Sequence, residues 1–474
     1  MHKELKIQLC QRSEPADVGE PPATLPTVGT NLTDLTLRKR RVTVRELGGC
    51  MGPIWPSYFR DCTSVIFMVD SANITQISSS CIQLLCVLSA EPLRSASVLV
   101  LFNKRKSTTD AIFALRILME KYRDGQRELH CLSVDLEKAY DRVPRAELWY
   151  CMRTSGVAEK YVRVVQDMYE RSRTVGRCAV GQTEEFKVEV GLHQGSALSP
   201  FLFAMVMDQL SEKVRQESPW TMMFADDIVV CSESREQVEE NLERWRFALE
   251  RRGMKVSRSK TEYMCVNERE GSGTVRLQGE EVKKVQEFKY LGSTVQSNGE
   301  CGKEVKKRVQ AGWNEWRKVS GVLCDQKISA RIKGKVYRTV VRPAMLYGLE
   351  TVSLRKRQES ELEVAELEML RFSLGVTRLD RIRNEYIRGT GHVGCLGDKV
   401  REARLRWFGH VQRRESEYTG RRMLDMELPG RRQRGRPKRR YMDGINDDMK
   451  LVGASVEDAE DRERWREMIR CGDP

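Results

Sequence analysis

Hydrophobic residues in the first hundred positions are grouped in short uninterrupted runs. Residues 64–70 and 97–102 are rich in Val, Ile, Leu and Phe and lack the alternation of a half-exposed strand. Runs of this kind are typical of strands buried on both faces of a parallel sheet. The segment 74–96 between them is long enough for a crossover helix. This part of the chain therefore predicts a β-α-β unit.

After residue 106 the spacing of the apolar positions changes. Residues 107–109 can cap a helix whose apolar stripe ends at Gly125. Residues 129–136 then alternate between apolar and polar, as in a strand. Residues 220–224 and 228–231 predict two more strands, which a tight turn joins.

Helical periodicity dominates the second half of the chain. A capping box, Ser234 with Gln237, predicts a helix that ends before Gly253. Residues 301–375 predict a small helical domain. The last stretch of the chain is basic and interrupted by Gly and Pro, and we expect it to be only partly ordered.

The charge of the chain is uneven. Its 474 residues include 82 Lys and Arg against 68 Asp and Glu, a net charge of +14, and residues 401–440 alone hold 14 basic and 5 acidic side chains. A basic excess of this kind favours a polyanionic partner. No apolar run is long enough to span a membrane, the first residues lack the apolar core of a signal peptide, and the 14 cysteines include no Cys-x-x-Cys pair. We therefore expect a soluble intracellular protein, in the nucleus or the cytoplasm, without a membrane partner.

Three carboxylates could carry chemistry. Asp135 lies on a predicted strand, and Asp226 and Asp227 lie at the tip of a predicted hairpin. Carboxylates placed in this way can hold two Mg²⁺ ions for phosphoryl transfer, because Mg²⁺ binds a few carboxylates together with substrate phosphates. The alternative interpretation is a solvated turn, since Asp is a common turn residue.

The sequence around these carboxylates resembles the reverse transcriptases of non-LTR (LINE-type) retrotransposons. Three blocks match the palm motifs of that family in order and spacing: LSVDLEKAYD at 132–141, GLHQGSALSP at 191–200 and FADD at 224–227. Two further blocks also match, GMKVSRSK at 253–260 and FKYLG at 288–292. The resemblance extends from about residue 105 to the C-terminus.

The resemblance implies an α+β fold with the palm of a right-hand polymerase. Residues 105–300 would form partial fingers and the palm, residues 301–390 a helical thumb or connection, and residues 391–474 a basic region that binds nucleic acid. The implied activity is RNA-directed DNA synthesis, in which deoxynucleoside triphosphates are added to the 3′-hydroxyl of a DNA primer on an RNA template.

The resemblance also implies roles for single residues. Asp135, Asp226 and Asp227 would bind two Mg²⁺ or Mn²⁺ ions. Lys260 would be the general acid that protonates pyrophosphate, although a solvated lysine is the alternative. Tyr140 would exclude the ribose 2′-hydroxyl.

Further residues of the same motifs would contact the substrates. Gln194 and Gly195 would lie under the template base and the incoming nucleotide. Phe288, Tyr290 and Gly292 would form the primer grip, which packs against the primer end.

The basic region contains Arg434-Gly-Arg436-Pro, the core of an AT-hook, in which arginines enter a narrow DNA minor groove. Lys438, Arg439 and Arg440 would add contacts to phosphates. A nuclear-import signal and a merely solvated tail are the alternatives.

The first part of the chain resembles a different family. GEPPATLPTVGTN at 19–31 and RELGGCMGPIW at 45–55 resemble the switch regions of ADP-ribosylation-factor-like small GTPases. We interpret residues 1–104 as a truncated Arf-like segment joined to a retroelement whose upstream fingers are missing, which makes polymerase activity doubtful. No phosphate-binding Gly-x-x-x-x-Gly-Lys-Ser/Thr loop is present in the sequence, and Lys106 replaces the aspartate that reads guanine. No functional GTP site is therefore expected.

Two other functions stay open. The chain could be an inactive fusion product that binds nucleic acid without polymerising it, or a GTPase-like regulator, which would require affinity for guanine nucleotides. The sequence does not indicate an oligomeric state.

Overall fold

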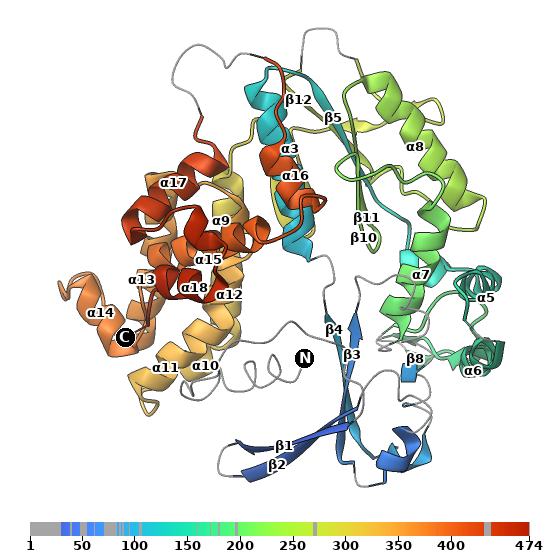
Figure 1. Ribbon diagram of the computed structural model, residues 1–474, viewed down its shortest axis with the longest axis horizontal. Coiled ribbons are helices and arrows are strands. Elements are labelled where there is room, and N and C mark those ends of the chain that lie inside the picture. The colour runs from blue at the N-terminus through green and yellow to red at the C-terminus, as the bar shows by residue number, and fades with distance from the viewer. Residues whose placement is uncertain are drawn as a thin grey trace. The chain divides into compact units, whose positions relative to one another are not determined.

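The computed structural model describes most of the chain. The described residues are 30–37, 40–47, 55–60, 62–70, 83–84, 87, 90–93, 95–103, 107–157, 159–170, 172–178, 181–194, 198–268, 273–430 and 438–473. The chain divides into two compact units: unit 1 comprises residues 1–105 and 152–170, and unit 2 comprises residues 106–151 and 171–474. Figure 1 shows the elements of both units.

The described part of unit 1 contains two pairs of strands. β1 (Thr30–Leu37) and β2 (Arg40–Leu47) are antiparallel, and this hairpin was not predicted from the sequence. β3 (Ser64–Asp70) and β4 (Ser97–Asn103) are parallel, as predicted. Much of the predicted crossover segment lies outside the described residues, which there include the short 3₁₀ helix η2 (Glu91–Leu93). A small apolar core lies in this unit, formed by Phe59, Phe67, Leu84, Val87 and Leu93.

Unit 2 is built on a five-stranded sheet in the order β10-β11-β5-β12-β15. Its strands are β5 (Leu129–Val134), β10 (Thr221–Phe224), β11 (Asp227–Ser232), β12 (Glu262–Val266) and β15 (Lys283–Lys284). All neighbours are antiparallel except β12 and β15. Because β5 lies in the centre, residues that follow its last position are close to the β10–β11 hairpin. The two hairpin strands were predicted correctly.

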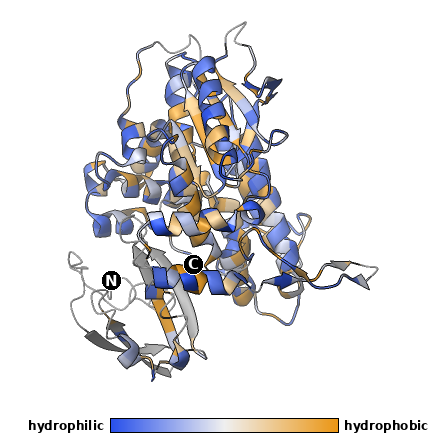
Figure 2. Cartoon of the chain, turned by 90° about the vertical axis from the view of Figure 1, so that its right-hand side faces the viewer, coloured by the Kyte–Doolittle hydropathy of each residue, from blue (hydrophilic) through white to orange (hydrophobic). Residues whose placement is uncertain are grey.

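Two long helices cover the sheet. α3 (Thr108–Asp124) begins after Ser107, whose side chain accepts a hydrogen bond from the backbone N–H of Thr109, and ends at Gly125. α8 (Arg235–Glu250) begins after Ser234, whose side chain accepts from the N–H of Gln237. Both helices were predicted from their caps. Figure 2 shows apolar residues along the strands and polar residues on the outer helix faces.

Shorter elements lie between and after the strands of this sheet along the chain, and one of them, α6, belongs to unit 1. They are α4 (Ala139–Arg142), α5 (Arg145–Thr154), α6 (Glu159–Glu170), β6 (Arg173–Thr174), β7 (Arg177–Cys178), β8 (Gly181–Gln182), β9 (Phe186–Lys187), α7 (Ser199–Ser211), β13 (Arg276–Leu277), β14 (Glu280–Glu281), β16 (Glu287–Tyr290) and β17 (Ser293–Gln296). β16 and β17 form an antiparallel hairpin that follows the main sheet.

Residues 301–375 are helical, as predicted. The helices from there to residue 391 are α9 (Gly302–Lys318), α10 (Ser320–Leu323), α11 (Ala330–Val336), the π-helix η3 (Tyr337–Val341), α12 (Arg342–Leu346), the 3₁₀ helix η4 (Leu349–Thr351), α13 (Lys356–Leu374) and α14 (Asn384–Gly391). Their buried faces share one apolar core. The α+β class, with a palm-like sheet followed by a helical thumb, is therefore confirmed.

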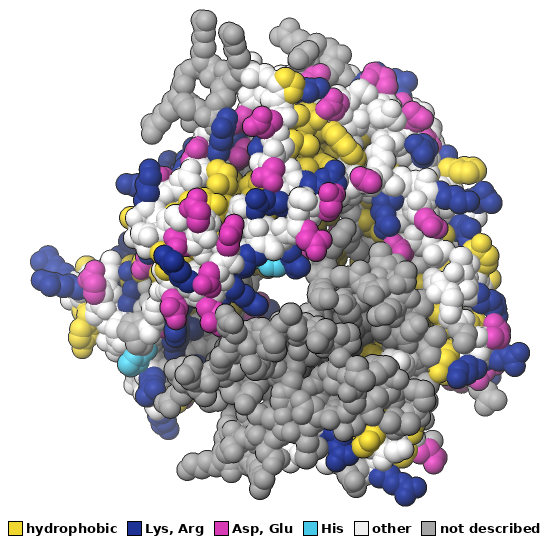
Figure 3. All heavy atoms as spheres, in the orientation of Figure 1, with side chains coloured by type: hydrophobic (Ala, Val, Ile, Leu, Met, Phe, Trp, Pro, Cys, Tyr) yellow, Lys and Arg dark blue, Asp and Glu magenta, His cyan; other side chains and the backbone are white. Residues whose placement is uncertain are grey.

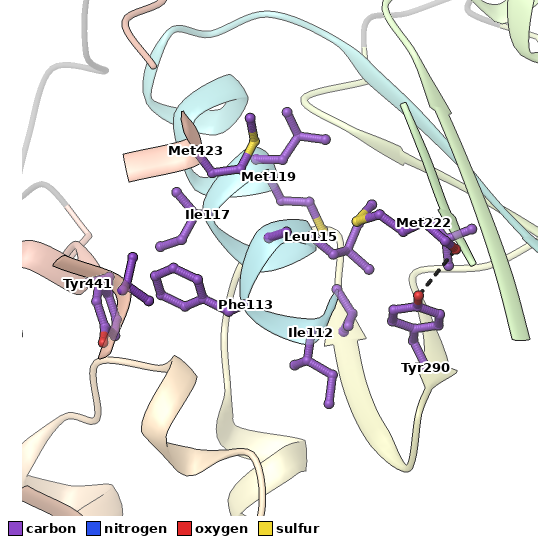
Figure 4. Packing of buried hydrophobic residues seen from close by; sticks show 14 of the residues in the cluster. Ile112, Phe113, Leu115, Ile117, Met119, Met222, Tyr290, Met423 and Tyr441 are labelled. Atoms are coloured by element: carbon purple, nitrogen blue, oxygen red, sulfur yellow. Dashed lines mark hydrogen bonds between the residues drawn. The ribbon is translucent and has the colours of Figure 1, made fainter. Parts of the chain in front are cut away.

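The C-terminal residues pack against the palm. They form α15 (Leu396–Gln412), α16 (Thr419–Asp425), α17 (Tyr441–Val452), the 3₁₀ helix η5 (Glu457–Ala459) and α18 (Arg462–Ile469). Figure 4 shows Met423 of α16 and Tyr441 of α17 in the same core as α3. The rings of Phe113 and Tyr441 meet edge to face, with centroids 5.0 Å apart. The described residues of the C-terminal stretch are therefore helical and packed, while residues 431–437, which contain Gly435 and Pro437, lie outside the described residues.

The C-terminal helices combine a high positive charge with a buried apolar face. Phe408, Tyr441 and Trp465 are almost fully buried although basic residues surround them in the sequence. Long cationic side chains leave one helix face free for packing, so a high net charge does not prevent a core. Within the described part of the chain, no helix has the length and apolar character needed to cross a bilayer.

Candidate active site

The three predicted metal-binding carboxylates lie at one end of the central sheet. β11 is antiparallel to β5, with Ile228 opposite Val134. One further step in this register sets Asp227 opposite Asp135, immediately after the end of β5. Asp226 precedes Asp227 in the turn of the β10–β11 hairpin. The structure therefore brings together carboxylates that are far apart in the sequence.

The turn between β10 and β11 is as short as a hairpin allows. Phe224 pairs with Asp227, so only Ala225 and Asp226 lie between the strands. Two-residue turns require positive φ angles and therefore favour Gly or Asn. Ala225 has the required positive angle, φ 54°, although it is neither of these residues. A non-glycine residue in this region is strained by roughly 1–3 kcal/mol, and such strain is concentrated at functional sites. The paired strands hold the turn, and with it the direction of both aspartates.

The carboxylates repel one another. Partial desolvation raises the pKa of Asp227 above its ordinary value, and the charges of Asp226 and Asp135 raise it further. The charge of Lys289 acts in the opposite direction. A site in which like charges raise a carboxyl pKa gains from a bound cation, because the cation neutralises this repulsion.

Lys260 lies beside Asp135. The segment before it runs along the end of β5: Val256 forms a β-bridge with Leu136, and the N–H of Ser257 donates to the carbonyl oxygen of Asp135 at 2.8 Å. The Lys260 Nζ atom then lies 3.6 Å from Asp135 Oδ1. Both side chains are well exposed, at 67% and 42%, so water screens this ion pair.

The donor set suits a hard divalent cation. Asp135 Oδ1 accepts no hydrogen bond, and its neighbour is the Lys260 ammonium group 3.6 Å away. Within the described residues, no three His, Cys, Asp or Glu side chains form a preformed ion site. A partial carboxylate set is compatible with Mg²⁺, which completes its shell with water and substrate phosphates.

Tyr140 and Gln194, the two described residues of the predicted nucleotide site, lie close to each other. The N–H of Leu192 donates to the carbonyl oxygen of Tyr140 at 2.8 Å, and Gln194 Nε2 donates to Asp141 Oδ1 at 2.8 Å. The Tyr140 ring stacks on Phe203 of α7 with a centroid distance of 4.3 Å. The loop that carries Gln194 is therefore bonded to α4, which carries Tyr140. Gly195 lies outside the described residues.

Gly191 permits this contact between the loop and α4. Its φ is 85°, and a Cβ atom there would lie 2.7 Å from the carbonyl oxygen of Asp141 and 2.9 Å from its Cα. We expect Gly191→Ala to lower the free energy of unfolding by about 2–5 kcal/mol, as the sum of backbone strain and a clash with backbone atoms that cannot move aside. Urea unfolding followed by circular dichroism measures this loss.

The control for this prediction is Gly375→Ala in the same unit. Gly375 has φ 69°, but a Cβ atom there would meet nothing within 4 Å. Only the strain of the backbone remains, so a loss of roughly 1–2 kcal/mol is expected. Equal losses in the two variants would contradict a close contact at Gly191.

The predicted primer-grip residues are mostly buried. Phe288 and Tyr290 are 2% and 1% exposed, and the Tyr290 hydroxyl donates to the carbonyl oxygen of Met222 at 3.2 Å, as Figure 4 shows. These side chains attach the β16–β17 hairpin to β10, while Gly292 lies in its turn with φ 76°. Lys289, between Phe288 and Tyr290, is exposed, and its positive charge lowers the pKa of Asp227. Sequence reasoning missed Lys289, although the alternation along β16 would have indicated it.

The described cations next to the predicted AT-hook, Lys438, Arg439 and Arg440, have partners inside unit 2. Lys438 Nζ donates to the carbonyl oxygen of Asn298 at 2.8 Å, and Arg440 Nε lies 2.5 Å from an oxygen of Asp124. Arg439 donates to the carbonyl oxygen of Leu354 and pairs with Asp447. Arg434 and Arg436 lie outside the described residues. On the face shown in Figure 3, Lys and Arg are interspersed with Asp and Glu, so the basic excess forms no uniform patch there.

Two family models match the chain. Residues 79–295 match the family described as reverse transcriptase (RNA-dependent DNA polymerase). Residues 14–134 match the ADP-ribosylation factor family. The first range contains the sheet that carries the three carboxylates, and the second contains unit 1 strands β1 to β4.

Curated relatives agree with both matches. Human ADP-ribosylation factor-like protein 16 is 58% identical over 97 residues, which are 20% of this chain and 49% of that protein. The Pol polyprotein of the Drosophila melanogaster type-2 retrotransposable element R2DM is 27% identical over 36% of this chain and 18% of its own length. The RNA-directed DNA polymerase from the mobile element jockey of Drosophila melanogaster is 23% identical, over 56% and 30%.

The chain spans less than half the length of each of these relatives. The similarity to retrotransposon proteins and the similarity to Arf-like GTPases concern different segments, whose family matches overlap over residues 79–134. The chain therefore joins an Arf-like segment to a segment similar to non-LTR reverse transcriptases.

Proposed function

We propose that this chain, in which a reverse transcriptase-like segment follows an Arf-like segment, is an RNA-directed DNA polymerase. The reaction is the addition of deoxynucleoside triphosphates to the 3′-hydroxyl of a DNA primer paired with an RNA template. The observation that carries the proposal is the register of the central sheet, which sets Asp227 opposite Asp135 with Asp226 in the adjoining turn.

Asp135, Asp226 and Asp227 would hold the divalent cations, Mg²⁺ or Mn²⁺, of which we expect two. When bound, such ions neutralise the triphosphate and lower the pKa of the attacking hydroxyl. The chain contributes a rigid strand end and a rigid turn, so the carboxylates need not reorganise during the reaction. The register that sets Asp227 opposite Asp135 and the raised pKa of Asp227 both support this role.

The neighbouring side chains would hold the substrates. Lys260, 3.6 Å from Asp135, would give a proton to the leaving pyrophosphate. Tyr140 would close the ribose pocket, because its stacking on Phe203 limits the movement of the ring. Gln194 would support the base from the loop bonded to α4. The exposed ammonium group of Lys289 would contact the primer backbone near the carboxylates.

The test is a primer-extension assay with the purified full chain. A labelled DNA primer is annealed to an RNA template and incubated with the four deoxynucleoside triphosphates and Mg²⁺. We expect extension to the template end, which requires the RNA strand and stops when EDTA removes the cation.

The matched control is the chain with Asp226→Asn and Asp227→Asn. If neither protein extends the primer while both still bind the RNA, the proposal fails. The alternative, a nucleic-acid-binding protein without catalysis, then takes its place.

A further inference from the structure

The β16–β17 hairpin, residues 287–296, is attached to the thumb by a buried glutamate. Glu304, in the first turn of α9, has no exposed surface. One carboxylate oxygen accepts the hydroxyl of Ser293 at 3.1 Å, and the other accepts the N–H of Thr294 at 2.7 Å. Arg308, one turn later on α9, pairs with Glu304 at 3.1 Å. A sequence reader would take a Glu in the first turn of a helix for a solvated residue that favours the helix dipole.

A second charge, which is partly buried, attaches the hairpin to the palm. Arg116 of α3 donates to the hydroxyl of Ser293 at 2.8 Å and to the carbonyl oxygen of Thr294 at 3.3 Å. It also donates to the hydroxyl of Thr351, the last residue of η4, and to the carbonyl oxygen of Gly348, which precedes η4. Burial lowers the pKa of Arg116, and the charge of Glu304 opposes this effect. The charges of Arg116 and Glu304 therefore stabilise each other, because a buried charge without an opposite charge nearby destabilises the fold.

The turn of the hairpin is held as well. Arg308 donates to the carbonyl oxygen of Gly292 at 2.7 Å. The hydroxyl of Tyr347 donates to the carbonyl oxygen of Leu291 at 2.8 Å. The strands and turn of residues 290–294 thus have polar contacts with α3, α9 and the segment after α12. From these contacts we expect the hairpin to keep its position relative to α9.

The opposite strand of the hairpin reaches the carboxylates. Tyr290 is bonded to Met222 of β10, the strand that leads into Asp226 and Asp227, and the charge of Lys289 acts on Asp227. The hairpin is therefore a mechanical link between the thumb helix and the end of the sheet that carries the chemistry.

We propose that Glu304 is a positioning residue for primer extension: by fixing the β16–β17 hairpin to α9, it places the primer 3′-terminus in line with the Asp226–Asp227 turn. This inference rests on the proposed polymerase function. Glu304 contacts no substrate in this mechanism. Its effect is on the rate of the bound complex, because misplacement by about 1 Å can cost roughly 100-fold in rate.

The first test compares Glu304→Gln with Glu366→Gln. Glu366 of α13 is also fully buried and pairs with two arginines, Arg342 and Arg388, but it lies in the thumb core away from the hairpin. We expect Glu304→Gln to slow the first nucleotide addition at saturating substrate by roughly 10- to 100-fold. Its dissociation constant for primer–template should change less than about threefold. Glu366→Gln should keep the wild-type rate within the same factor.

A merely structural role would affect both variants alike, or would weaken binding and rate together. If Glu304→Gln extends at the wild-type rate while wild type is active, the inference fails and the proposed function stands. If the wild-type protein does not extend the primer, the proposed function fails. The contact between Glu304 and the hairpin is then tested by hydrogen exchange.

Hydrogen exchange tests the link without catalysis. The Thr294 amide is bonded to Glu304, so we expect exchange in residues 287–296 to rise at least about tenfold in Glu304→Gln and in Glu304→Ala. Glu366→Gln should leave exchange of this segment unchanged. Equal protection of the hairpin in all variants would overturn the inference, whatever the activity.

Discussion

Replacing both Asp226 and Asp227 by asparagine should reduce the rate of primer extension by about 1000-fold or more. Asparagine keeps the size of the side chain and the hairpin, but removes two of the three negative charges. Loss of the divalent cations removes several kcal/mol of transition-state stabilisation, and each 1.36 kcal/mol corresponds to a factor of ten. Single-turnover extension with excess enzyme measures the rate, and primer–template binding should persist.

The same variant should be more stable than wild type at neutral pH in EDTA. The pKa of Asp227 is raised in the folded protein, so its ionisation opposes folding, and wild type loses stability as the pH rises through that raised pKa. Asparagine cannot ionise. The advantage of the variant should therefore disappear below about pH 3.9, the ordinary carboxyl pKa.

A matched carboxylate distinguishes site chemistry from general charge. Asp208 of α7 pairs with Arg215 at 2.8 Å on the surface, and Asp208→Asn should leave extension unchanged. Extension by the double variant within tenfold of wild type would show that these aspartates do not carry the reaction.

Arg404→Ala should be among the most destabilising single substitutions in unit 2. Arg404 of α15 is 2% exposed and binds Asp448 of α17 through two hydrogen bonds, at 2.6 and 3.0 Å. Truncation would leave Asp448 as an uncompensated charge in the core that joins the C-terminal helices to α3. We expect the free energy of unfolding to fall by about 3–5 kcal/mol, measured by urea unfolding.

Two variants qualify this prediction. Replacing the pair together, with Arg404→Met and Asp448→Leu, should recover much of the loss, because no lone charge remains. Lys318→Ala removes an exposed pair with Glu315 and should change stability by less than about 1 kcal/mol. A small effect of Arg404→Ala would mean that α15 and α17 do not belong to the folded core.

Local sequence features predicted the elements that carry the site. The caps at Ser107 and Ser234 and the short spacing between two apolar runs around Asp226 each act within a few residues, so the helices and the hairpin follow from them. The palm fold was also predictable, since motif order and spacing match a known family and the family comparison agrees. The roles of the single residues stay predictions.

Long-range partners account for what was missed. Glu304 has the character of a solvated residue in the sequence, and only the approach of Ser293 and Thr294 makes it a buried acceptor. Lys438 and Arg440 have the character of phosphate-binding cations, and only the approach of Asn298 and Asp124 gives them protein partners. No short-range pattern indicates such pairs, because the two members of each pair are brought together by packing.

The sequence by itself therefore determined which residues could do chemistry, which helices and strands carry the candidate site, and that two unrelated segments are joined. The tertiary structure decided that Asp135 and Asp227 are neighbours, that Lys260 is beside them, and that the C-terminal helices complete the core around α3. The physical reason is range. Caps, turns and periodicity act between residues a few positions apart, whereas register, burial and the pairing of charges depend on elements that meet only when the chain has folded.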